Sequence, residues 1–502
     1  MKVILAGYNV DVDTLNEYRR LAELSAVGDD EAAGLAGRLL EKDFLTPETI
    51  SAAYARISRN PRPVNELRHI AREEVDKARK SNRNIIFGLG HSSVAEHAAF
   101  NFDVLNISRL AVEAVEHFRL ASYTEKSQRY ILFKGDYIVP EEIRELGLAE
   151  EFQSLVEEQN KAYHLLYEKL HPYFFNKYPE MAGEQGQQRT LEGWAKEDAR
   201  YAISLATHTQ LGMTLNARSL ENMISKCAAH PLAEVREFAG QLSRVTEGIA
   251  PSLIKYTQPT DYLRNKPAHL KEWIAGSVTR EEAAKNSPEV ELLNFTPEAD
   301  RKILALALFR FGGLEWHAAE ETARNADSEQ LERFYREVFR DMNPWDSVLR
   351  EFEFVEFTFQ LIVSASNFGQ LKRHRMANLL VQPYRPELGI TVPPSISEIG
   401  MEKLLQEIAA KSAEFYAKVA WRNEAAAEYA LTNAHRRRVV IKMNLRELYH
   451  FMRLRMDAHA QWDIRETAQR MYEQIVDRVP LAAALMSGKD RFEEIKKNFF
   501  RS

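Results

Sequence analysis

The chain carries one series of motifs twice, and this repetition constrains its fold more than any other feature. Thr46-Pro47-Glu48 in the first half has a counterpart in Thr296-Pro297-Glu298, and NARSLEN from Asn216 has a counterpart in NLRELYHF from Asn444. The motifs keep one order, and partners lie roughly 230 to 255 residues apart, which indicates a tandem duplication and not a solenoid of short repeats. We therefore predict two copies of one domain, over residues 1–275 (copy one) and 276–502 (copy two).

The composition is typical of a globular protein and excludes some classes of function. Hydrophobic residues make up 45% and charged residues 28% of the 502 residues. A formal net charge of −6 argues against a general nucleic-acid binder. Cys227 is the one cysteine, so no internal disulfide can form and a cytoplasmic location is favoured. No apolar run approaches the ~18 residues of a membrane span, and the N-terminus does not resemble a signal peptide. We expect neither nucleic acid nor membrane as a partner.

Each copy is predicted to be α+β, with a modest sheet and long helices. Apolar residues alternate with polar ones over 100–104 and again over 357–361, which is the period of a strand. A helical stripe follows over 107–118, and the apolar run 130–133 predicts a further strand. Helices are also expected around 445–452 and from 461 to about 478, before Pro480. In both copies the Thr-Pro pair predicts a helix start, and 259–294 is expected to hold the junction.

Polar residues that suit an anionic ligand stand in different places in the two copies. In copy one, Glu125, Ser127 and Arg129 alternate, so an extended segment would point all three to one side. In copy two, the dense group Arg373-His374-Arg375 follows Gln370, and arginine forks match phosphate geometry. Either group alone is also compatible with a polar surface loop.

Two other polar clusters are less informative. His91, Ser93, Glu96 and His97 match no standard zinc spacing, so we expect no metal site and a structural role for His97. The basic run 435–438 is predicted to be a solvated helix face, with a local anion site as the alternative. The single Gly-x-Gly, at Gly88, lacks the third glycine of a dinucleotide-binding fold.

Together these motifs resemble the flavin-dependent thymidylate synthases, over nearly the whole chain and in two copies. That family's pattern is a GHxSxxEH stretch, then Ser-Arg, then Gln-x-x-Arg-His-Arg followed by a Glu-x-Ser-x-Arg loop. A distal Asn-x-Arg and an arginine shortly before Ala-Gln-Trp-Glu-Ile complete it. Copy one matches this pattern at His91, Ser93, Glu125, Ser127, Arg129 and Arg200; copy two matches it at Gln370, Arg373, His374, Arg375, Asn444, Arg446, His450 and Arg455.

The departures from the pattern are complementary. Copy one has Ala114 in place of the glutamine, keeps only Arg119 of the Arg-His-Arg, and has Lys226 or Cys227 at the distal arginine. Copy two has Val381 and Pro383 in the loop, Glu428 in place of Arg200, and Trp345-Asp346 near the missing Gly-His. Because the family's active site is a cleft shared between subunits, the resemblance implies one complete site assembled from both copies.

The resemblance also implies a reaction and its participants. Family members convert dUMP to dTMP, with methylenetetrahydrofolate as carbon donor, FAD as cofactor and NADPH as the usual reductant. Arg455 would be the catalytic residue beside the uracil. Glu125, Ser127, Arg129, Arg200, Gln370, Arg373 and Arg455 would bind the nucleotide, and His91, Ser93, Arg373, His374, Arg375, Asn444, Arg446 and His450 would bind the flavin. Because the family is homotetrameric, a homodimer of tandem chains would form a pseudo-tetramer.

Two alternatives stay open on the sequence alone. A catalytically inactive nucleotide- or flavin-binding regulator would also account for damage in both copies. A related flavin enzyme acting on another nucleotide is the second alternative. Random decay would sometimes strike equivalent positions in both copies, whereas these losses avoid each other, which favours an active enzyme.

Overall fold

The computed structural model describes residues 1–41, 45–277 and 287–501. The chain forms two compact units: unit 1 comprises Met1–Ser127, Gly135–Glu150 and Ala206–Arg280, and unit 2 comprises Gln128–Lys134, Glu151–Leu205 and Glu281–Ser502. Two segments from the first half of the sequence, 128–134 and 151–205, therefore fold with the second half. Among the described residues, no helix combines the length and apolar character needed to cross a membrane.

Unit 1 is built on a four-stranded antiparallel sheet. The strands are β1 (Lys2–Tyr8), β2 (Ala99–Ser108), β3 (Ala121–Glu125) and β4 (His208–Asn216), in the order β1-β2-β4-β3. Phe100, Phe102 and Val104 are buried while Asn101 and Asp103 are exposed, which confirms the predicted alternation. The helices of this unit are α1 (Val12–Ala26), α2 (Glu31–Glu41), α3 (Glu48–Arg56), α4 (Val64–Glu73), α5 (Val75–Arg83), α6 (Arg109–Glu116), α7 (Glu141–Glu145), α11 (Ala217–Ala228), α12 (Ala233–Thr246) and α13 (Asp261–Ser277).

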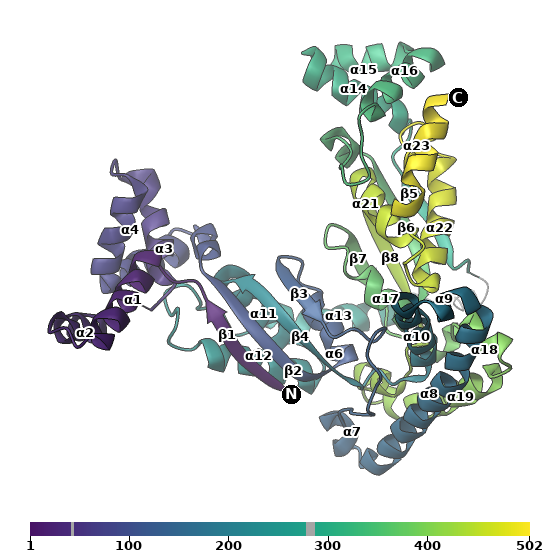
Figure 1. Ribbon diagram of the computed structural model, residues 1–502, viewed down its shortest axis with the longest axis horizontal. Helices are drawn as coiled ribbons and strands as arrows, with labels where there is room; N and C mark the ends of the chain where they lie inside the picture. Colours follow the sequence, from purple (N-terminus) through teal and green to yellow (C-terminus); the bar gives the residue numbers. More distant parts are fainter. Residues whose placement is uncertain (42–44, 278–286, 502) are drawn as a thin grey trace. The chain divides into compact units, whose positions relative to one another are not determined.

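Unit 2 contains a second sheet with the same topology. Its strands are β5 (Val290–Phe295), β6 (Glu356–Ser364), β7 (Asn378–Val381) and β8 (Arg436–Asn444), in the order β5-β6-β8-β7, all antiparallel (Figure 1). Two sheets with one strand order confirm the predicted α+β fold and its repetition. The helices are α8 (Ala149–Lys177, from its third residue), α9 (Pro179–Gly183), α10 (Gln185–Ala199), α14 (Ala299–Gly312), α15 (Trp316–Asn325), α16 (Ser328–Phe339), α17 (Ala365–Leu371), α18 (Pro394–Glu398), α19 (Glu402–Ala420), α20 (Glu424–Ala427), α21 (Leu445–Arg455), α22 (Trp462–Val476) and α23 (Phe492–Arg501).

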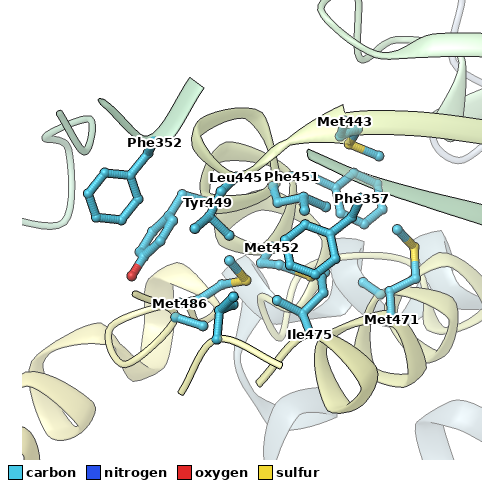
Figure 2. Packing of buried hydrophobic residues seen from close by; sticks show 14 of the residues in the cluster. Phe352, Phe357, Met443, Leu445, Tyr449, Phe451, Met452, Met471, Ile475 and Met486 are labelled. Carbon is cyan, nitrogen blue, oxygen red and sulfur yellow. The ribbon is translucent and has the colours of Figure 1, made fainter. Parts of the chain in front are cut away.

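The main core of unit 2 lies between its sheet and helices α21 and α22. Strand β6 contributes Phe357, and α21 contributes Tyr449 and Met452, all 3% exposed or less. Figure 2 shows these side chains converging with Met471 and Ile475 of α22. The helices predicted around 445–452 and from 461 to about 478 are thus confirmed, and their apolar stripes hold α21 against the sheet.

The two sequence copies meet inside unit 2 in a locally symmetric contact. Ser204 and Thr432 pair as an antiparallel bridge. Leu205 N donates to Leu431 O and Asn433 N donates to Ile203 O, each at 2.9 Å. Since 203–205 and 431–433 follow equivalent helical turns, η4 (Arg200–Ala202) and η7 (Glu428–Ala430), the contact has pseudo-two-fold symmetry. Helices α8 and α19 pack beside it, with Gln159 Nε2 donating to Ser412 Oγ at 2.9 Å.

Several local predictions were wrong. Residues 130–133 form a turn and coil with Tyr130 67% exposed; the strand is β3, earlier in the chain, because Ala121–Glu125 pairs with β4. The extended segment therefore ends at Glu125 and does not reach Arg129. The second Thr-Pro pair does not start its helix: α14 begins at Ala299, and the Thr296 hydroxyl accepts from Glu356 N instead.

The basic run 435–438 was also predicted wrongly. It enters strand β8, with His435 and Arg437 buried, and not a solvated helix face. Residues 259–277 of the expected junction include α13, whereas 278–286 lie outside the described residues.

Candidate nucleotide site

The candidate site lies in unit 2, where two capped helix starts position polar side chains. Ser364 caps α17 by accepting from Asn367 N at 3.0 Å, and Asn444 caps α21 by accepting from Glu447 N at 2.8 Å. Such side-chain caps satisfy backbone N–H groups that have no partner in the first turn of a helix. They fix where α17 presents Gln370 and where α21, at its last residue, presents Arg455.

Arg455 is held in a partly buried hydrogen-bond chain with His374 and Glu447. Arg455 Nε donates to His374 Nε2 at 3.0 Å, and Arg455 Nη2 donates to Gln370 O at 3.1 Å. His374 Nδ1 lies 3.3 Å from Glu447 Oε1. Because Nε2 accepts, the imidazole hydrogen is on Nδ1 and faces the carboxylate. Burial lowers the pKa of His374, which keeps the ring neutral at neutral pH.

Two arginines from different parts of the sequence lie close enough to Arg455 to affect its pKa. Burial, together with the charges of Arg373 and Arg129, lowers the pKa of Arg455 to about 10. Arg373 follows α17 and donates from Nε to Gly369 O at 3.2 Å. Arg129 comes from copy one, whereas the other two come from copy two. Positive charges gathered in this way favour the binding of an anion, and guanidinium groups suit phosphate.

Arg129 is oriented by residues of both copies. Its Nε donates to Glu197 Oε2 at 2.5 Å, and its Nη2 donates to His459 O at 3.3 Å. The preceding Gln128 is 5% exposed and accepts from Asn433 Nδ2 at 3.1 Å. These contacts hold the 128–130 turn against copy two.

Arg200 lies at the pseudo-symmetric contact described above. It is 5% exposed, and its carbonyl accepts from Asn433 Nδ2 at 3.0 Å. The nearby Asp198 accepts from Ser395 Oγ at 2.5 Å and from Trp462 Nε1 at 2.8 Å. Burial raises the pKa of Asp198 to about 7, although both donors lower it.

In copy two, the position equivalent to Arg200 is filled by an internal ion pair. Glu428 accepts from Tyr384 N at 2.8 Å and lies 3.9 Å from Arg437. The Arg437 guanidinium stacks 4.0 Å above the Tyr384 ring and 4.8 Å from that of Phe368. This cation is therefore engaged by a carboxylate and two rings, a cation–π arrangement that stabilises its charge.

The remaining predicted nucleotide residues belong to unit 1. Glu125 is buried at the end of β3, where it pairs with Arg109 and accepts from Thr209 Oγ1 at 3.1 Å. Ser127 is partly buried two residues beyond. These two residues thus belong to a different unit from Arg129.

The predicted flavin residues fall into two groups. His91 and Ser93 of unit 1 are exposed at the start of the helical turn Ser92–His97. In unit 2, Arg375 is exposed after α17 and His450 is exposed on α21, with its ring 5.9 Å from that of His374. Asn444 caps α21 as described, and Arg446 donates to Glu353 Oε1 at 2.6 Å.

His97 makes a ring contact: its imidazole stands edge-on to Tyr54 at 4.7 Å. In the part of the chain that the structure describes, no group of three or more potential metal ligands comes together.

Three site residues were missed from the sequence: Glu197, Glu447 and Tyr201. Tyr201 is fully buried, stacks on Trp462 at 5.8 Å, and donates to Asp463 Oδ2 at 2.8 Å. Its counterpart in copy two is also a tyrosine, Tyr429, so the repetition gave no sign of a special role. The two glutamates act through partners far away in the sequence, which no local pattern indicates.

Comparison with known proteins assigns the family. The profile of the Thy1 family, described as "Thymidylate synthase complementing protein", matches residues 38–252 and 291–481. "UPF0159 protein Ta1429" of Thermoplasma acidophilum is 25% identical over 492 residues, covering 88% of this chain and 95% of its own. A "Flavin-dependent thymidylate synthase" of Clostridium tetani is 31% identical over 225 residues, covering 44% of this chain and 86% of its own.

One solved structure is a distant match. The UMP/dUMP methylase PolB from Streptomyces cacaoi, bound with 5-Br dUMP, covers 40% of this chain and 95% of its own at 18% identity and a TM-score of 0.31.

The family profile spans most of the chain in two segments, one in each predicted copy. This confirms the predicted resemblance and the prediction that the chain is a member of an enzyme family. The chain belongs to the family of thymidylate synthase complementing proteins.

Proposed function

We propose that the chain is an FAD-dependent thymidylate synthase that methylates dUMP to dTMP at a site composed of residues from both copies. The observation that carries the proposal is the grouping of Arg129 from copy one with Arg373 and Arg455 from copy two in one folded unit. Positive charges gathered around Arg455 favour the binding of an anion, and the phosphate of dUMP supplies one.

In this proposal different arginines contact different parts of the nucleotide. Arg129, Arg200 and Arg373 bind the phosphate side, and Gln370 and Arg455 face the base. Arg455 stabilises negative charge on the uracil ring, which makes the ring nucleophilic without a cysteine. The His374–Glu447 pair supports this role, because it fixes the Arg455 guanidinium before the ligand arrives, and preorganised charge is the most effective kind. Glu125 and Ser127 remain proposed nucleotide contacts on the family resemblance.

The residues proposed for the flavin have suitable chemistry. Arg375 and Arg446 are cationic and accessible enough for a diphosphate, and exposed His450 offers a ring edge. His91, Ser93, Arg373, His374 and Asn444 remain proposed FAD contacts on the family resemblance. A flavin held by these residues and reduced by NADPH would supply hydride, and methylenetetrahydrofolate would supply the carbon of the methyl group. The work of this chain is to bind, orient and polarise.

We further propose that the repeated domains span 1–275 and 276–502 and that the chain assembles as a homodimer. Four copies in a closed two-fold dimer would reproduce a pseudo-tetramer.

The proposal is tested by the colour and the activity of the purified protein. A yellow protein that forms dTMP from dUMP, with methylenetetrahydrofolate and NADPH present, is the expected result. A yellow or nucleotide-binding protein that forms no dTMP would favour the inactive regulator. Product from a different nucleotide alone would indicate the related flavin enzyme.

A further inference from the structure

A chain of side-chain hydrogen bonds in unit 2 runs from a buried carboxylate to the candidate ligand site. Tyr201 OH donates to Asp463 Oδ2 at 2.8 Å, and Gln461 Nε2 donates to Tyr201 OH at 2.9 Å. Gln370 Nε2 then donates to Gln461 Oε1 at 3.2 Å. Tyr201 comes from copy one, and the other three residues come from copy two.

The direction of these bonds is set at the carboxylate end. Asp463 also accepts from Ser364 Oγ at 2.6 Å and from Asn367 Nδ2 at 2.8 Å, so it serves as an acceptor throughout. Tyr201 has a single hydroxyl hydrogen, and Asp463 takes it. The phenol oxygen can then only accept, which requires the amide nitrogen of Gln461 to point toward it.

The orientation of the Gln461 amide in turn sets the orientation of the Gln370 amide. With its nitrogen on Tyr201, Gln461 presents its oxygen to Gln370, and Gln370 must present its own nitrogen in return. The two amides therefore cannot flip independently. Gln370 Oε1 is left as a buried acceptor to which none of the described residues donates. A buried acceptor of this kind costs free energy until a donor reaches it.

A comparison between the copies shows which of these hydrogen bonds have a counterpart in copy one and which do not. Ser108 Oγ donates to Glu234 Oε2 at 2.6 Å, as Ser364 Oγ does to Asp463, so the serine–carboxylate contact occurs in both copies. Counting from those anchors, however, copy one has Ala114 in place of Gln370 and Leu232 in place of Gln461. The serine–carboxylate contact is shared, while both glutamines are absent from the copy that also lacks the Arg-His-Arg.

We propose that Asp463, Tyr201 and Gln461 are positioning residues that fix the Gln370 amide with its oxygen toward the ligand, so that the site selects a base with an N–H donor. This inference rests on the proposed function, because it concerns the base of the bound nucleotide. The neutral uracil ring that binds presents an N3–H donor, whereas N3 of cytosine is an acceptor. The fixed oxygen therefore accepts from uracil and opposes the lone pair of cytosine.

The test compares the affinities of the purified full-length protein for dUMP and dCMP, measured by calorimetric titration. Gln461→Leu, which introduces the residue of copy one, frees the Gln370 amide to rotate. Tyr201→Phe removes the hydroxyl that sets the direction. Each variant should lower the preference for dUMP over dCMP at least tenfold, because a rotated amide offers its N–H to cytosine.

Two further variants distinguish positioning from general damage. Gln461→Glu can only accept, so it still draws Gln370 Nε2 and should retain the preference for dUMP. Tyr429→Phe, at the position equivalent to Tyr201 in copy two, should also retain it. Thermal melting of every variant establishes that it is folded.

The outcomes separate this inference from the proposed function. A folded Gln461→Leu or Tyr201→Phe protein that keeps the unaltered preference for dUMP overturns the positioning role alone. Loss of the preference in Gln461→Glu would also overturn it, because the direction of the bonds would then not matter. An unaltered protein that binds neither nucleotide overturns the proposed function, and this inference with it.

Discussion

Replacing Arg455 by lysine tests whether a fixed positive charge beside the base drives the reaction. The site lowers the pKa of Arg455 to about 10, mainly through burial and further through the charges of Arg373 and Arg129. An arginine with this pKa stays charged throughout the ordinary assay range. A lysine starts near 10.4, and the same environment would bring it to about 8. Arg455→Lys should therefore lose its charge within a range where the enzyme can be assayed.

The assay is the rate of dTMP formation from pH 6.5 to 9.5 in the unaltered protein and its variants. Below pH 8 the Arg455→Lys protein should retain part of its activity, and above it the rate should fall about tenfold per pH unit relative to the unaltered protein. Arg455→Ala should keep its flavin but lose about a hundredfold or more at every pH. Arg453→Lys is the matched control, because Arg453 lies on the same helix but stacks on Phe492 at 5.3 Å. A pH profile of the Arg455→Lys protein that runs parallel to that of the unaltered protein would refute the reasoning.

The remaining predictions follow from the structure and the sequence. Because the folded-state pKa of Asp198, about 7, lies above its ordinary value of 3.8, the folded protein keeps a proton that the unfolded chain releases. The protein's free energy of unfolding should therefore fall between about pH 4 and 7, by up to roughly 4 kcal/mol. Asp198→Asn should make this fall smaller in urea titrations at pH 5 and 8. An equal fall in the variant and the unaltered protein would contradict this. Phe357→Ala, in the core of unit 2, should cost about 3–5 kcal/mol in the same titrations, and a cost below about 1 kcal/mol would argue against tight packing there. Lys226→Ala should leave dTMP formation unchanged. Titration with nucleotide should approach one equivalent bound per chain, whereas two equal sites per chain would exclude the composite arrangement. Light scattering should give a dimer, and a stable monomer at micromolar concentration would count against the pseudo-tetramer.

Much of the fold could be predicted because its signals are local. The alternation of buried and exposed residues over 100–104 and 357–361 depends only on the period of a strand, and the structure has β2 and β6 at those places. Strand β8 was missed because its run of consecutive arginines resembles the polar face of a helix. Arg437 is buried there, and Glu428 and the Tyr384 ring help to stabilise its charge. These partners come from other parts of the sequence.

The site was less predictable for the same reason. The repeated motifs indicate which residues to consider, such as Arg129 and Arg373, but not that 128–134 and 151–205 fold with the second half of the sequence. Glu447 was missed because a glutamate in the first turn of a helix is ordinary, and its significance comes from the His374 ring 3.3 Å away. A residue that acts through a partner shows no pattern of its own in the sequence, because its role depends on where the fold brings that partner.

The complementary losses have a physical explanation in the pseudo-two-fold contact at Ser204 and Thr432. In a symmetric dimer, each substitution appears twice, so damage to one site damages both. Joining the copies in one chain removes that constraint, because a residue can then change on one side of the axis alone. Glu428 illustrates the result: it replaces the counterpart of Arg200 and pairs with Arg437, while Arg200 itself persists. Selection for one working site preserves one set of positions, and the other set is free to acquire ion pairs that stabilise the fold. That asymmetry is the pattern expected of an enzyme that retains one active site, and it is not expected of a chain that has lost its ligands altogether.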